Sequence, residues 1–300
     1  MASTLVILNP YTGRWAGRRR RPEAERALRA AGLDFELVET EGPRHGERLA
    51  EAAARQNRPV VVAGGDGSIG EVLNGMYRSR PDGVLGPLGI LPLGTANDLV
   101  HNLGLPLDLD GAAAAIAAGN TRRIDLGMVN DWVFCNNSAV GLEPVVTQHN
   151  VRLVRLRGVV RYLVAALLAI RDRPSWHMHL AWDDGEFDGP VSLVSVGNCP
   201  VTGGLFRMAP AADPTDGLLT FVYGYAPTRG KMLSLLPRAI SGAYVRDPAM
   251  HQLHTRGLTI EARPATPIQV DGELRSESLT QIRYRALPAR LDVFASVPAG

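Results

Sequence analysis

Lysine is nearly absent from this sequence. Lys231 is the single lysine among 32 lysine and arginine residues. A P-loop needs the pattern G-x-x-x-x-G-K-[ST], and a protein kinase needs a strand lysine and an H-R-D loop. Neither pattern occurs, and the fingerprint G-x-G-x-x-G is missing from the first strand–helix turn. These absences exclude P-loop and protein-kinase nucleotide sites, and arginine would have to take the place of lysine beside any phosphate.

Cysteines and long apolar runs are also scarce, and the net charge is small. Cys135 and Cys199 fit no zinc or redox spacing, which favours a reducing cytoplasm. The net charge of +2 is too small to imply a nucleic-acid partner by itself. The longest apolar run, 159–170, is interrupted by Arg161 and is shorter than the ~20 residues that span a bilayer. It predicts a buried or half-buried helix, with a membrane-surface helix as the alternative.

The first half of the chain alternates strand and helix patterns. Short apolar runs predict strands at 4–9, 35–40, 59–65 and 88–94. Apolar residues at helical spacing predict helices at 22–32, 46–56, 68–77 and 110–119. This order indicates an α/β domain, with a parallel sheet between two layers of helices.

The pattern changes after about residue 128. Alternating segments punctuated by Gly, Pro and Asp predict strands at 176–184, 191–198, 218–225, 257–262 and 266–273. Helical segments at 152–172 and 228–243 interrupt them. We therefore expect an α/β domain at 1–127 and a mainly β sandwich at 128–284, and the seam between them is the default place for a site.

Three glycine-bearing turns follow predicted strands of the first domain. They are "NPYTGR" (9–14), "GGDGS" (64–68) and "LPLGTAND" (91–98). Ligands of open parallel sheets bind beyond the carboxyl ends of the strands. Glycine lets backbone N–H groups approach a phosphate, and the following helix N-terminus favours negative charge. Three such turns at successive strand ends predict a nucleotide-phosphate site.

Carboxylates beside this site would repel phosphates unless a metal ion lies between them. Asp66 and Asp98 belong to the turns, and Asp125 ends the α/β half. Mg²⁺ suits such a place, because one or two carboxylates plus phosphate oxygens suffice to bind it. The alternatives are a helix N-cap for Asp98 and a structural hydrogen bond for Asp125.

These motifs, in this order and spacing, resemble the diacylglycerol kinase catalytic-domain family, of which the soluble bacterial lipid kinases are the closest type. "APAADPTDGLL" (209–219) and "VDGE" (270–273) extend the resemblance over nearly the whole chain. The string "GGDGS" alone also resembles motifs of NAD kinases and phosphofructokinases. The resemblance implies an ATP- and Mg²⁺-dependent kinase that phosphorylates a lipid hydroxyl. ATP would lie between the two domains, and residues from about 285 to 300 would return to the first domain.

The resemblance also implies the residues of the nucleotide and Mg²⁺ site. They are Asn9, Pro10, Gly13, Arg14, Thr40, Gly64, Gly65, Asp66, Gly67, Ser68, Glu71, Asn74, Gly94, Thr95, Asn97, Asp98 and Asp125. A second, structural metal ion would be held by the Asp213 carbonyl, the Asp216 carboxylate and the Leu218 carbonyl. An Asp-Gly turn between strands is the alternative there.

The catalytic residues that the resemblance implies are Glu273, Asp271 and Asp66. Glu273 would take the proton of the lipid hydroxyl, with Asp271 close by. Without the resemblance, Asp-Gly between alternating runs predicts a plain hairpin turn.

We therefore expect a cytoplasmic lipid kinase that associates transiently with the membrane surface, where its substrate lies. Five arginines within 14–21 are candidates for contact with anionic headgroups, and a solvated helix start is the alternative. No nucleic-acid partner is expected, and a homodimer is left open. The competing functions are an NAD kinase-like phosphotransferase acting on a soluble substrate and a non-catalytic, nucleotide-regulated lipid-binding protein.

Overall fold

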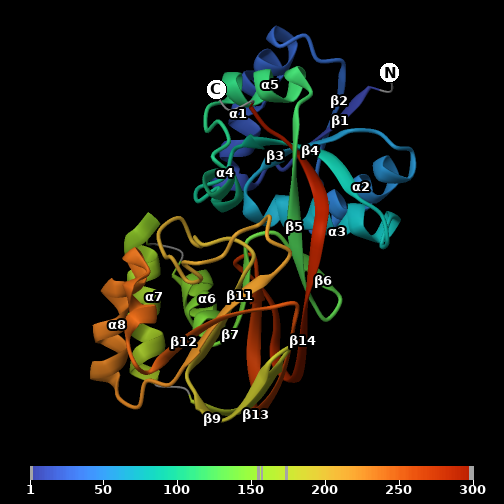
Figure 1. The fold of residues 1–300 in the computed structure, drawn as a ribbon. Coiled ribbons are helices and arrows are strands. Elements are labelled where there is room, and N and C mark those ends of the chain that lie inside the picture. Colours follow the sequence, from blue (N-terminus) through green and yellow to red (C-terminus); the bar gives the residue numbers. More distant parts are fainter. Residues whose placement is uncertain (1–2, 154–155, 157, 173–174, 297–300) are drawn as a thin grey trace. The chain divides into compact units, whose positions relative to one another are not determined.

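The computed structural model describes residues 3–153, 156, 158–172 and 175–296. The chain forms two compact units (Figure 1). Unit 1 comprises Met1–Leu126 and Pro288–Gly300, and unit 2 comprises Gly127–Leu287. Within the described residues, no helix has the length and apolar character needed to cross a membrane. The expected class, an α/β domain followed by a β sandwich, is confirmed.

Unit 1 is built on a parallel sheet with the order β14-β4-β3-β1-β2. The strands are β1 (Thr4–Leu8), β2 (Phe35–Glu39), β3 (Val60–Gly64), β4 (Leu85–Pro92) and the last part of β14 (Glu273–Phe294). Strand β5 (Thr121–Val129) pairs with β14. Apolar β-branched runs such as 60–62 are buried on both faces, as expected of a parallel sheet covered by helices. The carboxyl ends of β1, β3 and β4 therefore lie at one edge.

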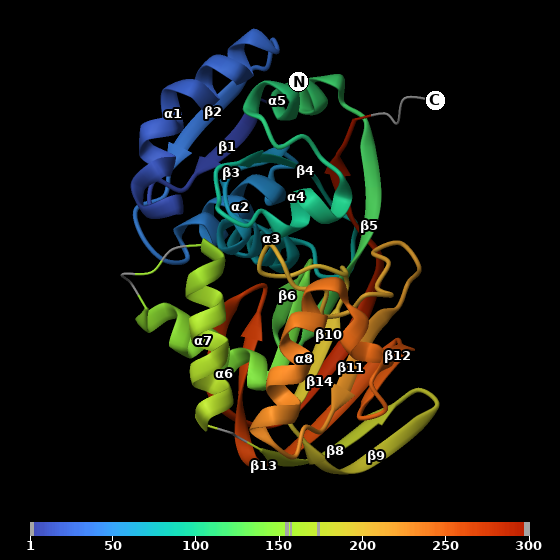
Figure 2. The same ribbon diagram turned by 90° about the vertical axis from the view of Figure 1, so that its left-hand side faces the viewer.

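Helices cover both faces of this sheet (Figure 2). They are α1 (Thr12–Ala30), α2 (His45–Arg55), α3 (Asp66–Ser79), α4 (Asp98–Leu103) and α5 (Leu109–Ala118). Side chains two apart on a strand, such as Val6 and Leu8, pack with Leu28 of α1 and Ile116 of α5. Helices α2 and α3 pack against each other.

Helix α1 begins ten residues earlier than expected, at Thr12 rather than at residue 22. Residues 18 and 19 in its first half are exposed arginines, so no apolar periodicity marks this half. Pro22 lies inside the helix, although it is the residue type that usually marks a helix start.

Unit 2 contains antiparallel strands with the order β12-β11-β10-β7-β13-β14. They are β6 (Trp132–Phe134), β7 (Asn137–Gly141), β8 (Trp176–Trp182), β9 (Gly185–Val191), β10 (Leu193–Gly197), β11 (Leu219–Gly224), β12 (Met250–Thr255), β13 (Gly257–Val270) and β14. Strand β13 pairs with β8 over 258–263 and with β7 over 268–270. Irregular pairing with β14 between these stretches lets one strand pair with both β8 and β7, so the two strands expected at 257–262 and 266–273 are one.

Three helices and a 3₁₀ turn pack on one face of β10 and β11. They are α6 (Leu142–Arg152), α7 (Gly158–Asp172), α8 (Arg229–Ser241) and η1 (Ala243–Arg246). Val222 of β11 packs with Ile170 of α7 and Met232 of α8 in this layer. The helix expected at 152–172 is α7, which begins at Gly158, and the sequence did not predict α6 before it. Residues 154, 155 and 157 lie outside the described part.

Glu143, in the first turn of α6, is a carboxyl group within unit 2. Burial raises its pKa to about 7, and the nearby side chains of Ser195 and Asn137 oppose that rise. Tyr244 of η1 and Tyr284 of β14 share this interior, and burial and the charge of Glu143 raise the pKa of both phenols. Both tyrosines therefore stay protonated near neutral pH, and Glu143 is the group that titrates there.

Gly75→Ala should destabilise unit 1. A Cβ atom at this position in α3 would collide with the carbonyl oxygen of Glu47 in α2. Overpacking of this kind costs about 2 kcal/mol, more than the ~1 kcal/mol that alanine gains over glycine inside a helix. Urea unfolding followed by far-UV circular dichroism measures the change. Gly230→Ala in α8 is the matched control, because the nearest atom to a Cβ there is 3.9 Å away. Equal stability of the two variants would contradict the packing of α2 on α3.

Glu143→Gln should make unit 2 less sensitive to pH. The folded pKa of about 7 lies above the ordinary 4.5. The folded state therefore holds the proton more tightly than the unfolded chain. The contribution of Glu143 to stability is therefore greatest below pH ~4.5 and falls as the pH rises towards ~7. Glutamine cannot ionise, so its advantage over wild type should grow by about 2 kcal/mol between pH ~5 and ~8.

Tryptophan fluorescence during urea unfolding tests this expectation, since Trp132, Trp176 and Trp182 all belong to unit 2. Glu186→Gln, at an exposed position on β9, is the control and should show no pH-dependent difference. A constant difference between Glu143→Gln and wild type across this range would rule out the raised pKa.

Candidate active site

Three loops at the carboxyl edge of the unit 1 sheet are tied together by hydrogen bonds. Asn9, after β1, donates from Nδ2 to Ser68 Oγ in α3 over 2.9 Å. Its Oδ1 accepts the backbone N–H of Tyr11 at 3.0 Å. Leu93, after β4, donates its backbone N–H to the carbonyl of Gly64 at 2.9 Å. The predicted glycine turns thus form one connected edge.

The glycines of these loops make close backbone contact. A Cβ on Gly65 would lie 2.9 Å from Gly94 Cα, and a Cβ on Gly94 would lie 2.5 Å from Gly65 Cα. A Cβ on Gly64 would lie 2.5 Å from the Cβ of Ser68. No side chain fits at these positions without movement of the backbone, so the glycines are needed for the loops to meet at all.

Asp66 links this edge to a second helix. It is the first residue of α3, and its Oδ1 accepts the backbone N–H of Leu99 in α4 at 3.4 Å. Burial raises its pKa, and backbone N–H groups of Leu99, Asp98 and Asn97 oppose that rise. A carboxylate is thus held where two helices begin, a place that also favours the negative charge of a phosphate.

Asp98 and Asp125 are buried in unit 1. Asp98 is the first helical residue of α4, and the N-cap position belongs to Asn97, which has a left-handed backbone. Asp125 of β5 accepts the backbone N–H of Ala289 at 2.5 Å, which matches the structural hydrogen bond considered as its alternative.

Among the described residues, no three His, Cys, Asp or Glu side chains come together as a set that could hold a metal ion. Mg²⁺ needs only one or two carboxylates beside phosphate oxygens and waters. The Asp66 carboxylate, beside loops where glycine leaves no room for a Cβ, fits such an ion.

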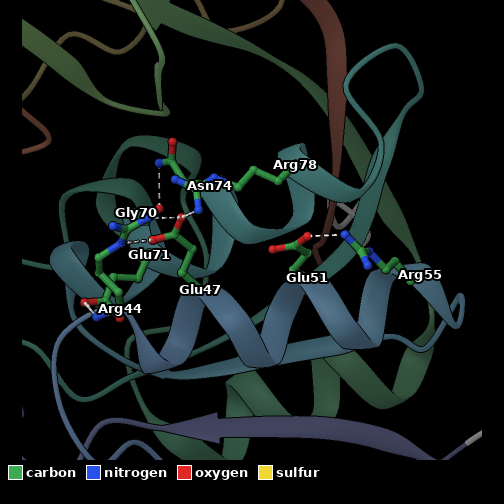
Figure 3. Close-up of polar contacts among 8 residues, drawn as sticks. All are labelled: Arg44, Glu47, Glu51, Arg55, Gly70, Glu71, Asn74 and Arg78. Atoms are coloured by element: carbon green, nitrogen blue, oxygen red, sulfur yellow. Dashed lines mark hydrogen bonds and ion pairs between the residues drawn. The ribbon is translucent and has the colours of Figure 1, made fainter.

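Several other predicted nucleotide residues make contacts with the protein itself (Figure 3). Glu71 Oε1 accepts the backbone N–H of Arg44 at 3.0 Å, which holds the loop after β2 against α3. Asn74 Nδ2 donates to the carbonyl of Gly70 at 2.8 Å. Thr40, at the end of β2, is buried and donates its backbone N–H to Leu8.

The remaining predicted nucleotide residues also lie on these loops or beside them. Pro10 directly follows Asn9, and Gly13, with a φ of +60°, lies in the first turn of α1. Gly67 is in the first turn of α3, and Thr95 is exposed between β4 and α4. Arg14 belongs to α1, but its side chain lies outside the described part of the chain. The nucleotide contacts of all these residues stay predictions.

In unit 2, Asp271 and Gly272 form the turn between β13 and β14. Their φ values are +47° and +79°, and Val270 pairs with Glu273 across the turn. The hairpin considered as the alternative is therefore present. The Asp271 carboxylate is buried and accepts the backbone N–H groups of Cys135 (3.0 Å), Asn136 (2.8 Å) and Asn137 (3.1 Å).

Burial raises the pKa of Asp271 to about 6, although its backbone donors favour the charged form. Glu273, two residues on, is exposed at the start of β14. Asp271 thus anchors the turn that carries Glu273.

The loop predicted to hold a second metal ion is also a set of turns. Asp213 Oδ1 accepts the backbone N–H and the hydroxyl of Thr215, at 2.9 and 2.6 Å. Asp216 Oδ1 accepts the backbone N–H of Leu218 at 2.9 Å, across Gly217 with its φ of +78°. The Asp-Gly turn is present, and the metal ligands there stay a prediction.

Sequence reasoning missed one polar group, formed by Glu143, Asn137 and Ser195. Asn137 Nδ2 lies 3.5 Å from Glu143 Oε2, and Thr202 donates its hydroxyl to Asn137 Oδ1 at 2.8 Å. The one signal in the sequence was a lone acid within the otherwise apolar "AVGLEPVV".

Comparisons with known proteins agree with this architecture. Residues 3–129 match the family described as Diacylglycerol kinase catalytic domain. Residues 137–295 match the family described as YegS C-terminal NAD kinase beta sandwich-like domain.

Curated relatives carry the name diacylglycerol kinase. One from Staphylococcus saprophyticus is 28% identical over 89% of this chain and 88% of its own length. One from Staphylococcus aureus is 26% identical over 97% of this chain and 91% of its own. A solved Bacillus anthracis structure, titled as that of a diacylglycerol kinase, superposes with a TM-score of 0.74 at 19% identity, covering 99% of this chain and 97% of its own. At that identity the likeness shows the fold.

The expected resemblance is confirmed over both units. The chain belongs to the family that joins a diacylglycerol kinase catalytic domain to a YegS-type C-terminal β sandwich, a family of lipid kinases, which are phosphotransferases acting on an alcohol group.

Proposed function

We propose that this protein transfers the γ-phosphoryl group of ATP to the hydroxyl group of a lipid, with Mg²⁺ as cofactor, and that diacylglycerol is the first lipid to test. The observation that carries the proposal is the connected edge of glycine loops in unit 1, with the Asp66 carboxylate at the start of two helices. The names of the curated relatives support the choice of lipid.

The phosphates of ATP would bind along the three loops. Backbone N–H groups at the start of α3 and α4 would face them, because glycine leaves no side chain in the way. Asn9 keeps Ser68 at this edge through its amide. Asp66 would hold Mg²⁺, with Asp98 and Asp125 in the surrounding network. The ion supplies positive charge for the phosphates, which this chain cannot supply with a P-loop lysine.

Glu273 would accept the proton of the lipid hydroxyl and hold its oxygen in line. A base must be positioned before it can act, and the turn before Glu273 is fixed by the three backbone N–H groups that Asp271 accepts. Asp271 is in this proposal a positioning residue.

The substrate would be reached from the cytoplasm at the membrane surface. Arg18 and Arg19 of α1 are exposed, near the exposed rings of Tyr11 and Trp15, which lie 4.6 Å apart. Aromatic rings and arginines of this kind suit a membrane interface, where each basic residue contributes about 1 kcal/mol with anionic lipids. Arg21 is instead ion-paired with Glu25 and Glu39.

Incubation of purified protein with radiolabelled ATP, Mg²⁺ and diacylglycerol in mixed micelles tests the activity. Wild type should label the lipid. Asp66→Asn should lower kcat at least about 100-fold while far-UV circular dichroism shows an intact fold. Asp82→Asn, at an exposed position of unit 1, is the control and should keep full activity. Label in NAD but in no lipid would favour the NAD kinase-like alternative, and transfer to no acceptor would favour a non-catalytic lipid-binding protein.

Glu273→Gln should lower kcat by about 10² to 10⁴ with little change in the KM for ATP, because a general base acts in the chemical step. Glu277→Gln, on an exposed position of the same strand, is the matched control. Steady-state kinetics with ATP and lipid varied in turn separates the two parameters. A Glu273→Gln enzyme with wild-type kcat would remove Glu273 from the mechanism.

A further inference from the structure

The polar group of Glu143, Asn137 and Ser195 lacks the hydrogen bonds that buried polar atoms normally make. Ser195 is fully buried on β10, yet its Oγ has no hydrogen-bond partner among the described residues. Within the same described ranges, Glu143 Oε1 is buried and has no partner either. Glu143 Oε2 has the long contact of 3.5 Å from Asn137 Nδ2, and the Ser195 hydroxyl lies near the carboxyl group without a hydrogen bond of good geometry. Carboxylate and hydroxyl therefore hold unused hydrogen-bonding capacity in one place.

Two other buried carboxylates of unit 2, Asp271 and Asp247, are well satisfied. Asp271 accepts three backbone N–H groups. Asp247 pairs with Lys231 and Arg238, at 2.7 and 2.9 Å. Unsatisfied buried polar atoms are rare and costly, so one in a folded protein calls for an explanation. A ligand that completes the hydrogen bonds is such an explanation.

The group lies next to the turn that carries the proposed catalytic base. Asn137 takes part in both, since its backbone N–H donates to Asp271 and its side chain faces Glu143. Asp271 is two residues before Glu273. A lipid whose hydroxyl reacts at Glu273 could thus form further hydrogen bonds with the polar group of Glu143, Asn137 and Ser195. Asn137 connects this group to Asp271.

The chemistry of the group selects among headgroups. A carboxylate accepts hydrogen bonds from hydroxyl groups, and a serine hydroxyl both donates and accepts. A phosphate on the ligand would be repelled by the carboxylate at close range in a low-dielectric interior. An uncharged alcohol headgroup is not repelled in this way.

We propose that Glu143, Ser195 and Asn137 bind the uncharged, hydroxyl- or ester-bearing headgroup of the acceptor lipid, and that they disfavour acceptors with an anionic headgroup. This inference rests on the proposed lipid-kinase function. It makes Glu143 a specificity-determining residue and narrows the substrate class to neutral glycerolipids.

Kinetics with two acceptors test the inference. Wild type, Glu143→Gln and Ser195→Ala are compared on diacylglycerol and on phosphatidylglycerol in nonionic mixed micelles. Glu143→Gln should raise the KM for diacylglycerol about tenfold, the effect of losing one hydrogen bond to a charged group. Ser195→Ala should raise it about threefold or more. The KM for ATP should stay within about twofold in both. The preference for diacylglycerol over phosphatidylglycerol should shrink in Glu143→Gln.

Controls separate binding from folding. Glu186→Gln should behave as wild type, since Glu186 is exposed on β9. Melting temperature should be unchanged or higher in Glu143→Gln, so that a raised KM does not reflect unfolding. A purely structural role would change the kinetics with ATP and both lipids alike, and that result would overturn the inference.

Two further outcomes are distinguishable. If wild type phosphorylates diacylglycerol and both variants keep its KM, the headgroup site is wrong and the proposed function stands. If wild type phosphorylates no lipid, the proposed function fails and the headgroup site fails with it.

Discussion

The backbone contact between Gly65 and Gly94 is the constraint on which the candidate site of unit 1 depends. Each glycine occupies the space that a side chain on the other would need. The hydrogen bond from Leu93 N–H to the Gly64 carbonyl continues the β3–β4 pairing up to this contact. The same closeness brings the start of α4 within reach of Asp66. These glycines therefore hold the loops together.

Buried carboxylates in this chain differ mainly in what surrounds them. Asp271 has three backbone donors, and Glu47 lies between the guanidinium groups of Arg44 and Arg78. Asp66 has backbone donors at the start of α4, and burial still raises its pKa. Glu143 has one long contact. The first two find their partners within the protein, whereas Glu143 retains capacity for a partner from outside, as functional groups commonly do.

Sequence patterns predicted those parts of the fold that local residues determine. The buried run 60–62 and the helical spacing of Ile69, Val72, Leu73 and Met76 mark β3 and α3 without knowledge of the rest. Strand β7 (Asn137–Gly141) was missed because its side chains are mostly small or polar and its burial comes from distant strands. The single strand β13 was expected as two, since Pro264 interrupts its pattern and proline usually separates strands.

The residues of the candidate sites also divide into those that local sequence predicts and those that it does not. The loops of unit 1 could be predicted, because tight strand–helix turns depend on glycines that are adjacent in sequence. Glu143 could not, because an acid in the first turn of a helix already has a sufficient local reason, its favourable interaction with the helix dipole. That interaction offsets part of the cost of a buried charge. It lets the carboxylate persist without a full set of hydrogen bonds, so its oxygen stays available to a ligand. The position in the first turn of a helix therefore explains both why the sequence did not single out Glu143 and why the residue can bind a ligand.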